Sequence, residues 1–263
     1  MAAVVEKKRA RLSDAQASTS FYNLRAGAYD IRSRASRHAL RHALSNGKQI
    51  NVIAEIKRAS PSKGDLGLRG TVEETARAYS RGGAVAISVL TEEDYFHGSL
   101  ADLRAVRRAV SLPVLRKDFI FDDYQLYEAA AAGADALLLI VALLDDETLL
   151  RLRTIAETEL GMDALVEVHT SEEMTRASAA GATLIGVNNR NLRTFDVAID
   201  VSFDLGKEAP AEALLVSESG LRAGAELGRL RKAGYHGFLI GETLVTSENP
   251  ETSLRALIEE AET

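Results

Sequence analysis

Two opposite charges stand at the end of an apolar run in the first third of the chain, within VIAEIKRASPSKG at 52–64. The run reads as a buried strand, but Glu55 and Lys57 come at its end, just before a Ser-Pro-Ser-Lys-Gly loop. Charges beside an apolar core are costly unless they pair with each other or contact a ligand. An ion pair that closes the end of a strand is the simpler interpretation of this segment taken alone.

Similar polar side chains recur at the ends of later apolar runs, which favours a functional interpretation. Lysines and carboxylates gathered in one place can shift each other's pKa values and supply a general acid together with a general base. A single strand-end lysine is more often a solvated rim residue, but the recurrence along the chain is harder to explain in that way. The groups are Glu55 and Lys57, Lys117 and Asp118, Glu167, Asn188 and Arg190, and Glu218 and Ser219.

Glycines at the last two strand ends indicate a site for an anion. The sequence reads Ser-Glu-Ser-Gly at 217–220 and Leu-Ile-Gly-Glu-Thr at 239–243. Glycine lets backbone N–H groups approach a phosphate, and the start of a following helix adds a favourable dipole. We therefore expect a phosphate at Gly220 and Gly241, with the N–H of Glu242 directed at the anion and its carboxylate directed away.

Eight short apolar runs must position these groups. Their starts lie 20 to 32 residues apart, which leaves room for a loop, a helix and a turn between them. Glycines that end helices precede several runs, as in GGAVAISVL, GADALLLI, GATLIGV and GYHGFLI, and Thr71 with Glu74 and Thr170 with Glu173 predict capping boxes. The runs are Val52–Ile56, Ala84–Leu90, Val114–Leu115, Ala136–Val141, Ala164–Val168, Leu184–Val187, Leu214–Val216 and Phe238–Ile240.

This pattern predicts an α/β fold, a (β/α)8 TIM barrel. Apolar strands without hairpin dipeptides are typical of a parallel sheet, and eight is the number of strands at which such a sheet closes. The C-terminal strand ends of a barrel face one pocket, and phosphate sites recur in the loops after its last two strands. An open doubly wound sheet is the alternative, but SPSKGDLG stands where that fold usually has a G-x-G-x-x-G turn.

Residues 1–50 precede the first strand and are predicted to form an N-terminal helical extension of a single barrel domain at 51–263. We expect a helix around Asp30–Leu44, with a poorly defined stretch before it. The extension carries a net charge of +7 and the remainder −13. Because few aromatic residues accompany its arginines, we expect a basic helical face that packs on the acidic body, and no nucleic-acid partner.

Composition excludes several other classes of protein. No apolar run approaches the roughly 18 residues needed to span a bilayer, and the N-terminus lacks the apolar core of a signal peptide. The sequence has no cysteine, and its five histidines show no zinc-binding spacing. We expect a cytoplasmic protein without a membrane partner or a metal site.

Eight segments, in order along about four-fifths of the chain, match one known family. They are IAEIKRASPSKG at 53–64, SVLTEEDYFHGS at 88–99, PVLRKDF at 113–119, LLLIV at 137–141, ALVEVH at 164–169, IGVNNRNL at 185–192, VSESG at 216–220 and FLIGETL at 238–244. In them the chain resembles indole-3-glycerol phosphate synthase. The resemblance implies a (β/α)8 lyase without cofactor or metal, and we expect a monomer. Its substrate would be 1-(2-carboxyphenylamino)-1-deoxyribulose 5-phosphate, which is closed to indole-3-glycerol phosphate with loss of carbon dioxide and water.

The resemblance also implies roles for individual residues. The family's general acid in its K-D-F motif falls on Lys117, and its general base in V-E-V falls on Glu167. The E-I-K pair falls on Glu55 and Lys57, the lysine lying near the substrate carboxylate and being available as a second acid. The N-x-R and E-S-G motifs add Asn188, Arg190, Glu218 and Ser219.

The same resemblance places the two ends of the substrate. The phosphate would contact Ser60, Gly220, Gly241 and the N–H of Glu242, a residue that stands where the family often has serine. The aromatic ring would contact Phe96, Phe119, Leu138 and Leu192.

The residue types suit this chemistry independently of the resemblance. Ring closure needs a proton for a ketone oxygen, and a lysine whose pKa is lowered by a neighbouring cation is suited to give it, as Lys117 beside Lys57 would be. Loss of water then needs a base, for which Glu167 is expected on the opposite side of the mouth. The division of the acid roles between the two lysines stays open.

Two other functions remain as alternatives. Phosphoribosylanthranilate isomerase would share the phosphate site, but it would lack the E-I-K-R-x-S-P-S segment and typically uses an Asp/Cys pair, whereas this sequence has no cysteine. A sugar-phosphate binding module without activity would not need the full acid–base set. A turnover assay distinguishes these possibilities.

Overall fold

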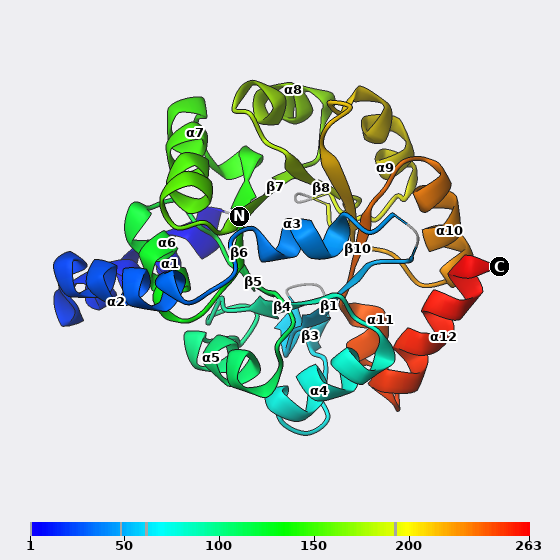
Figure 1. The fold of residues 1–263 in the computed structure, drawn as a ribbon, viewed down its shortest axis with the longest axis horizontal. Coiled ribbons are helices and arrows are strands. Elements are labelled where there is room, and N and C mark those ends of the chain that lie inside the picture. The colour runs from blue at the N-terminus through cyan, green and yellow to red at the C-terminus, as the bar shows by residue number, and fades with distance from the viewer. Residues whose placement is uncertain (1, 48, 61–62, 192–193) are drawn as a thin grey trace.

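Eight parallel strands close into a barrel in the computed structural model, which describes residues 2–47, 49–60, 63–191 and 194–263 (Figure 1). The first strand pairs with the second strand of the barrel on one side and with the last on the other, which completes the ring. Each strand begins and ends within two residues of a predicted run, so the predicted barrel is confirmed and the open sheet is wrong. The strands are β1 (Val52–Ile56), β4 (Ala86–Leu90), β5 (Val114–Lys117), β6 (Ala136–Ile140), β7 (Asp163–Val168), β8 (Leu184–Asn188), β9 (Leu214–Glu218) and β10 (Gly237–Ile240).

Helices alternate with these strands and surround the barrel (Figure 1). A small antiparallel hairpin of β2 (Ala59–Ser60) and β3 (Gly64–Asp65) follows β1. None of the helices in the described ranges is long and apolar enough to cross a lipid bilayer. The helices of the barrel are α4 (Val72–Gly82), α5 (Leu100–Ala109), α6 (Asp123–Ala131), α7 (Asp146–Thr154), α8 (Ser171–Ala179), α9 (Asp200–Leu205), α10 (Gly224–Lys232), α11 (Glu242–Val245) and α12 (Pro250–Glu262).

The predicted helix boundaries have the expected local chemistry, with one difference. Thr71 and Glu74 form the predicted capping box at the start of α4. Thr170 caps α8 by accepting from the N–H of Glu173, but the Glu173 carboxylate reaches back to His169 instead of completing a box. Four glycines that precede strands have φ between 73° and 101°, in the region that favours glycine: Gly83, Gly133, Gly181 and Gly234.

The barrel interior is apolar at one end and charged at the other. An inward-facing apolar layer, together with two leucines of α3 (Ala39–Leu44), contains Ile53, Leu115, Leu165 and Val216. Two residues further along the same strands stand Glu55, Lys117, Glu167 and Glu218. Because successive side chains of a strand point to opposite faces, these four charged groups also point into the barrel, at its C-terminal end.

The N-terminal region differs from its prediction. It forms three helices, α1 (Ala2–Ser18), α2 (Phe21–Ser33) and α3, so the continuous helix predicted at Asp30–Leu44 is wrong, and the stretch before it is helical. A buried contact accounts for the break between α2 and α3. Arg32 is buried and donates hydrogen bonds to the backbone carbonyls of Leu160, Gly161 and Ser36. These bonds hold the chain against the barrel at the point where a straight continuation of α2 would carry it away from the barrel.

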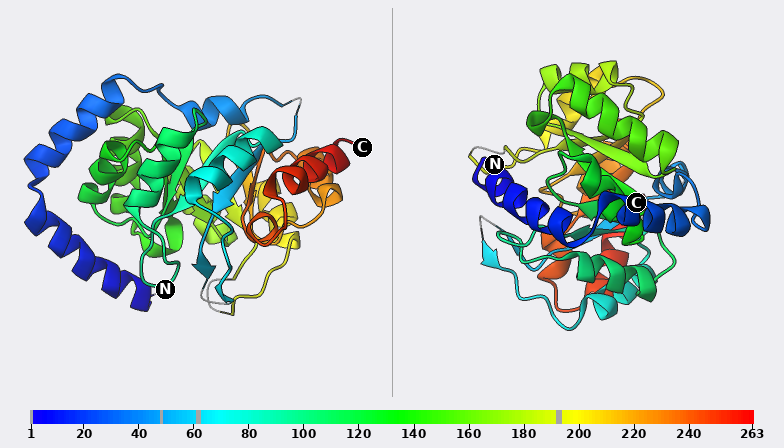
Figure 2. Two further views of the ribbon diagram at one scale, coloured as in Figure 1. Left: turned by 90° about the horizontal axis from the view of Figure 1, so that it is seen from below. Right: turned by 90° about the vertical axis from the view of Figure 1, so that its left-hand side faces the viewer.

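Basic side chains of α1 pair with acidic groups of the barrel, as the separation of charge predicts. Lys8 Nζ lies 2.7 Å from Asp118 Oδ2 and 2.8 Å from Glu93 Oε2, and Arg11 Nε lies 2.8 Å from Asp94 Oδ2. Figure 2 shows α1 and α2 curving around one side of the barrel, with the N-terminus at the same end as the hairpin. These contacts bring α1 beside the charged end of the barrel interior.

Candidate active site

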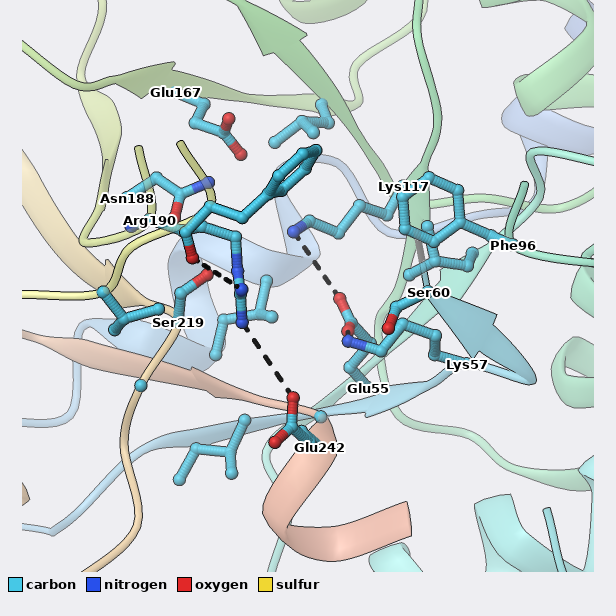
Figure 3. A pocket seen from close by; sticks show the side chains of 18 of the residues that line it. Glu55, Lys57, Ser60, Phe96, Lys117, Glu167, Asn188, Arg190, Ser219 and Glu242 are labelled. Carbon is cyan, nitrogen blue, oxygen red and sulfur yellow. Dashed lines mark hydrogen bonds and ion pairs between the residues drawn. The ribbon is translucent and has the colours of Figure 1, made fainter. Parts of the chain in front are cut away.

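A cavity of about 320 Å³ opens at the C-terminal end of the barrel strands (Figure 3). All but two of the residues predicted for the site line it. Glu218 is fully buried and reaches the site through its contact with Lys117, and Leu192 lies outside the described residues. The predicted residues that line the cavity are Glu55, Lys57, Ser60, Phe96, Lys117, Phe119, Leu138, Glu167, Asn188, Arg190, Ser219, Gly220, Gly241 and Glu242.

Two lysines and two carboxylates form a compact cluster on the floor of this cavity. Glu55 lies between the lysines, with Oε1 3.0 Å from Lys57 Nζ and Oε2 3.5 Å from Lys117 Nζ. Lys117 Nζ also lies 3.2 Å from Glu218 Oε2. The strand-end ion pair considered for Glu55 and Lys57 therefore exists, but it belongs to a larger cluster that faces a cavity.

Lys117 is surrounded by carboxylates. Burial by itself lowers the pKa of its ammonium group, but the charges of Glu218, Glu55 and Glu167 outweigh burial and raise the pKa well above its ordinary value. The prediction that a neighbouring cation lowers the pKa of this lysine is wrong, because Glu55 stands between the two lysines. Lys117 is consequently protonated at neutral pH, which is the form that a general acid needs.

The buried carboxylates have pKa values shifted in opposite directions. Burial raises the pKa of Glu167, but its contact with His169 and the charge of Lys117 outweigh burial and lower the pKa to about 2. Burial also raises the pKa of Glu218. The charge of Lys117 opposes this effect and the charge of Glu167 adds to it, so that the pKa of Glu218 is raised to about 7. Such a separation allows one carboxylate to remain ionised while its neighbour holds a proton.

His169 is a site residue that sequence reasoning did not single out. Its Nε2 lies 3.2 Å from Glu167 Oε1, and its Nδ1 lies 3.1 Å from Glu173 Oε2. Burial lowers the pKa of His169, but the two carboxylates outweigh burial and raise it to about 10. The sequence did contain a signal for His169: it directly follows a strand, two residues after Glu167 and four before Glu173, which lies in the first turn of a helix.

The loops after β9 and β10 supply a second kind of surface. Ser219 and Gly220 both have left-handed backbone, with φ of 68° and 79°. Gly241 precedes the first residue of the short helix α11, Glu242. These loops place backbone close to the cavity on the side away from Glu167, where the phosphate site is predicted.

The Glu242 side chain does not point away from the site as predicted. Its Oε1 lies 2.6 Å from Lys63 Nζ. Its Oε2 lies 3.9 Å from Arg190 Nη2, a contact that Figure 3 shows. The two cations attract the carboxylate across the rim of the cavity, which accounts for the difference. Glu242 therefore partly neutralises the side chains best suited to contact an anion there.

Two glycines make room for the buried carboxylates. A Cβ on Gly241 would overlap Glu55 Oε1, and a Cβ on Gly186 would overlap Glu218 Oε1. Gly241 has an ordinary φ of −118°, so its backbone does not require glycine. The lack of a side chain at Gly241 thus makes room for the charged cluster as well as for any anion, a role that the glycine pattern alone did not indicate.

An apolar wall faces the charged cluster. The rings of Phe96 and Phe119 have centroids 6.4 Å apart, and both line the cavity near Leu138. Ala3 and Val4 of α1 also line it, so the N-terminal region contributes to the site in a way that sequence reasoning left open. Lining residues that were not predicted include Leu90, Tyr95, Ile140, Phe195, Val197 and Leu221.

One group of carboxylates in the described part of the chain is close enough to suggest a metal site: Glu92, Glu93 and Asp94, whose oxygens lie within 4.8 Å of one another. Each of them already has another role. Glu92 accepts hydrogen bonds from backbone N–H groups of the loop that follows, including that of Asp94 itself, and the other two pair with Lys8 and Arg11. This group therefore anchors α1 to the barrel.

Comparisons with known proteins agree with this geometry. A solved structure of thiamine phosphate pyrophosphorylase from Pyrococcus furiosus is similar with a TM-score of 0.60 over 82% of this chain and 96% of that chain. At 17% sequence identity this similarity concerns the fold alone. The family model for indole-3-glycerol phosphate synthase matches residues 1–257.

Two relatives named indole-3-glycerol phosphate synthase extend this match to whole sequences. The one from Carboxydothermus hydrogenoformans is 50% identical over 97% of this chain and 98% of its own length. The one from Nocardioides sp. is 47% identical over 97% of this chain and 96% of its own length. The chain belongs to the indole-3-glycerol phosphate synthase family, carboxy-lyases of tryptophan biosynthesis.

Proposed function

We propose that this chain closes 1-(2-carboxyphenylamino)-1-deoxyribulose 5-phosphate to indole-3-glycerol phosphate, with Lys117 as general acid and Glu167 as general base. The observation that carries the proposal is the setting of the Lys117 ammonium. It faces the cavity between Glu55 and Glu218, while an ionised Glu167 enters from another strand. An acid and a base thus face one enclosed space from different sides.

The two ends of the substrate match two surfaces of the cavity. The phosphate would lie at the loops after β9 and β10, with the N–H groups near Gly220 and Gly241 and the side chain of Arg190 within reach. The aromatic ring would lie against Phe96 and Phe119. Lys57, held 3.0 Å from Glu55, is placed to contact the substrate carboxylate.

Ring closure and decarboxylation follow from this placement. The aromatic carbon that bears the carboxylate attacks the ketone carbon, while Lys117 donates a proton to the ketone oxygen. Positive charge then develops on the nitrogen as an iminium. The carbon–carboxylate bond breaks, its electron pair returns to the ring, and carbon dioxide leaves.

Dehydration completes the indole. A second proton, from Lys117 or Lys57, goes to the new hydroxyl group, which leaves as water, and Glu167 removes a proton from the carbon next to the nitrogen. Two protons are given and one is taken, so each turnover consumes one proton. This balances the negative charge that is lost with the substrate carboxylate.

The test is a direct turnover assay. Formation of indole-3-glycerol phosphate raises indole fluorescence, and the chain contains no tryptophan to mask it. Carbon dioxide release should match indole formation one to one. A folded chain that binds the substrate without producing an indole would instead support a sugar-phosphate binding module.

The proposal extends to a cytoplasmic monomer that uses no cofactor, as the sequence and the resemblance lead us to expect. Gel filtration with light scattering tests the oligomeric state, and fractionation of the source cells tests the location. Activity that survives chelation and dialysis would support a reaction carried by protein groups alone.

A further inference from the structure

His169 lies between two carboxylates at the side of the cavity where Glu167 enters. Glu173, in the first turn of α8, accepts a hydrogen bond from the His169 backbone N–H at 2.7 Å, and the same oxygen lies 3.1 Å from ring Nδ1. Because one oxygen holds both the backbone and the ring, the orientation of the imidazole is fixed, with Nε2 toward Glu167. The His169 side chain is only 11% exposed, so water screens this arrangement weakly.

The contact between His169 and Glu167 is an ion pair without the geometry of a hydrogen bond. Nε2 lies 3.2 Å from Glu167 Oε1, but this buried nitrogen has no aligned hydrogen-bond acceptor. An ion pair of this kind stabilises the ionised carboxylate and keeps a positive charge beside it.

Charged groups from three sides act on Glu167. Lys117 of β5 and His169 favour its ionised form, whereas Glu218 of β9 repels it. In the proposed reaction Lys117 gives up its proton and with it its charge. His169, which does not take part in that proton transfer, is then the cation that still acts on Glu167.

We propose that His169, held by Glu173, is a positioning residue that keeps the Glu167 carboxylate ionised and directed into the cavity throughout the reaction. This inference rests on the proposed role of Glu167 as base. A Glu167 that took up a proton from elsewhere could not remove the substrate proton. Loss of the imidazolium should therefore act on kcat and leave KM nearly unchanged.

The first test is the pH profile of kcat for His169→Gln, which keeps an amide near the position of Nε2 but carries no charge. Without the cation the pKa of Glu167 rises, so activity should be lost as the pH falls. Because the pKa of Glu167 is about 2 in the wild type, we expect the acid limb of the kcat profile to lie at least about one pH unit higher in the variant than in the wild type. A profile that coincides with the wild type overturns the proposal.

Glu173→Gln should shift the profile in the same direction as His169→Gln, but by less. With that carboxylate removed, the ring loses the contact that orients it and the pKa of His169 falls toward its ordinary value, but at the low pH where Glu167 takes up a proton the imidazolium is still present. A residue with a merely structural role would not give graded shifts of this kind in the two variants. His42→Gln is the matched control, because this exposed histidine of α3 lies outside the cavity lining and should leave the profile unchanged.

A titration of the wild type keeps the proposal testable if the variants fold poorly. His169 should remain protonated through the neutral range and titrate with a pKa of about 10 in NMR spectra of the imidazole groups. Titration near the ordinary value of 6.5 overturns the proposal. If the wild type produces no indole, the proposed function fails and the role of His169 with it, whereas an active wild type with an unaltered His169→Gln profile refutes the role of His169 alone.

Discussion

Replacing Lys117 with methionine separates its proposed role as an acid from its role as a counter-ion. Methionine keeps an unbranched side chain but removes the ammonium group that lies 3.2 Å from Glu218 and 3.5 Å from Glu55. As the proposed acid, Lys117 should account for a factor of roughly 10²–10⁴ in kcat. KM should change much less, because the proposed phosphate and ring contacts lie elsewhere in the cavity.

The same substitution should destabilise the protein in a pH-dependent way. Removing one partner of a buried ion pair costs about 3–5 kcal/mol, because a buried charge is left uncompensated. Glu218 can avoid this cost by binding a proton, since its pKa is already raised to about 7 in the wild type. A carboxyl group whose pKa is raised by folding stabilises the fold below its unfolded pKa, and this contribution is lost as the pH rises through the folded value. We therefore expect the free energy of unfolding of Lys117→Met to approach the wild-type value at about pH 5 and to lie roughly 3 kcal/mol below it at about pH 8.

The double variant Lys117→Met with Glu218→Gln is the control. It removes the uncompensated charge, so its thermal stability at the higher pH should recover while its turnover should not. Thermal unfolding followed by circular dichroism at both pH values, with indole fluorescence for turnover, measures both effects. Near-normal turnover in Lys117→Met would refute the assignment of the acid, and equal destabilisation at both pH values would refute the electrostatic account.

The remaining predictions concern the base, the rim and the glycines. Glu167→Gln should lower turnover by roughly 10²–10⁴-fold while calorimetry still detects binding of the product. Loss of turnover and product binding together would indicate a structural role for Glu167. Glu242→Ala should release Lys63 and Arg190 for the anion and tighten phosphate binding about two- to fivefold, which is the effect expected of a partly exposed ion pair. Weaker phosphate binding in this variant would contradict the arrangement. Gly241→Ala should lower kcat as well as affinity because its Cβ would overlap Glu55, whereas Gly27→Ala, with open space around it, should leave both unchanged. A Gly241→Ala variant that alters affinity alone would indicate that the glycine serves only the phosphate.

Much of the site could be predicted because strand periodicity determines it. Apolar residues at Ile53 and Leu115 place the residues two positions later, Glu55 and Lys117, on the same inward face of the barrel. Once eight such strands are recognised, their C-terminal ends must share one mouth. The position of these charged groups was therefore already present in the spacing of the sequence.

The N-terminal helices could not be predicted in the same way. The break between α2 and α3 depends on Arg32, two of whose hydrogen-bond acceptors, Leu160 and Gly161, lie more than 120 residues away. Nothing in the local sequence identifies those acceptors. The same reason explains why the contribution of Val4 to the cavity was missed.

The sequence by itself determined the family, the barrel and the charged groups that stand at its C-terminal mouth, because motif order and strand alternation can be read along the chain. The tertiary structure alone decided how those groups affect one another. Glu55 stands between Lys57 and Lys117, His169 adds a cation beside Glu167, and Glu242 turns toward the rim cations. Electrostatic energies depend on distances between residues far apart in the chain and on their burial, so the protonation states of the site follow from the folded geometry and not from residue type.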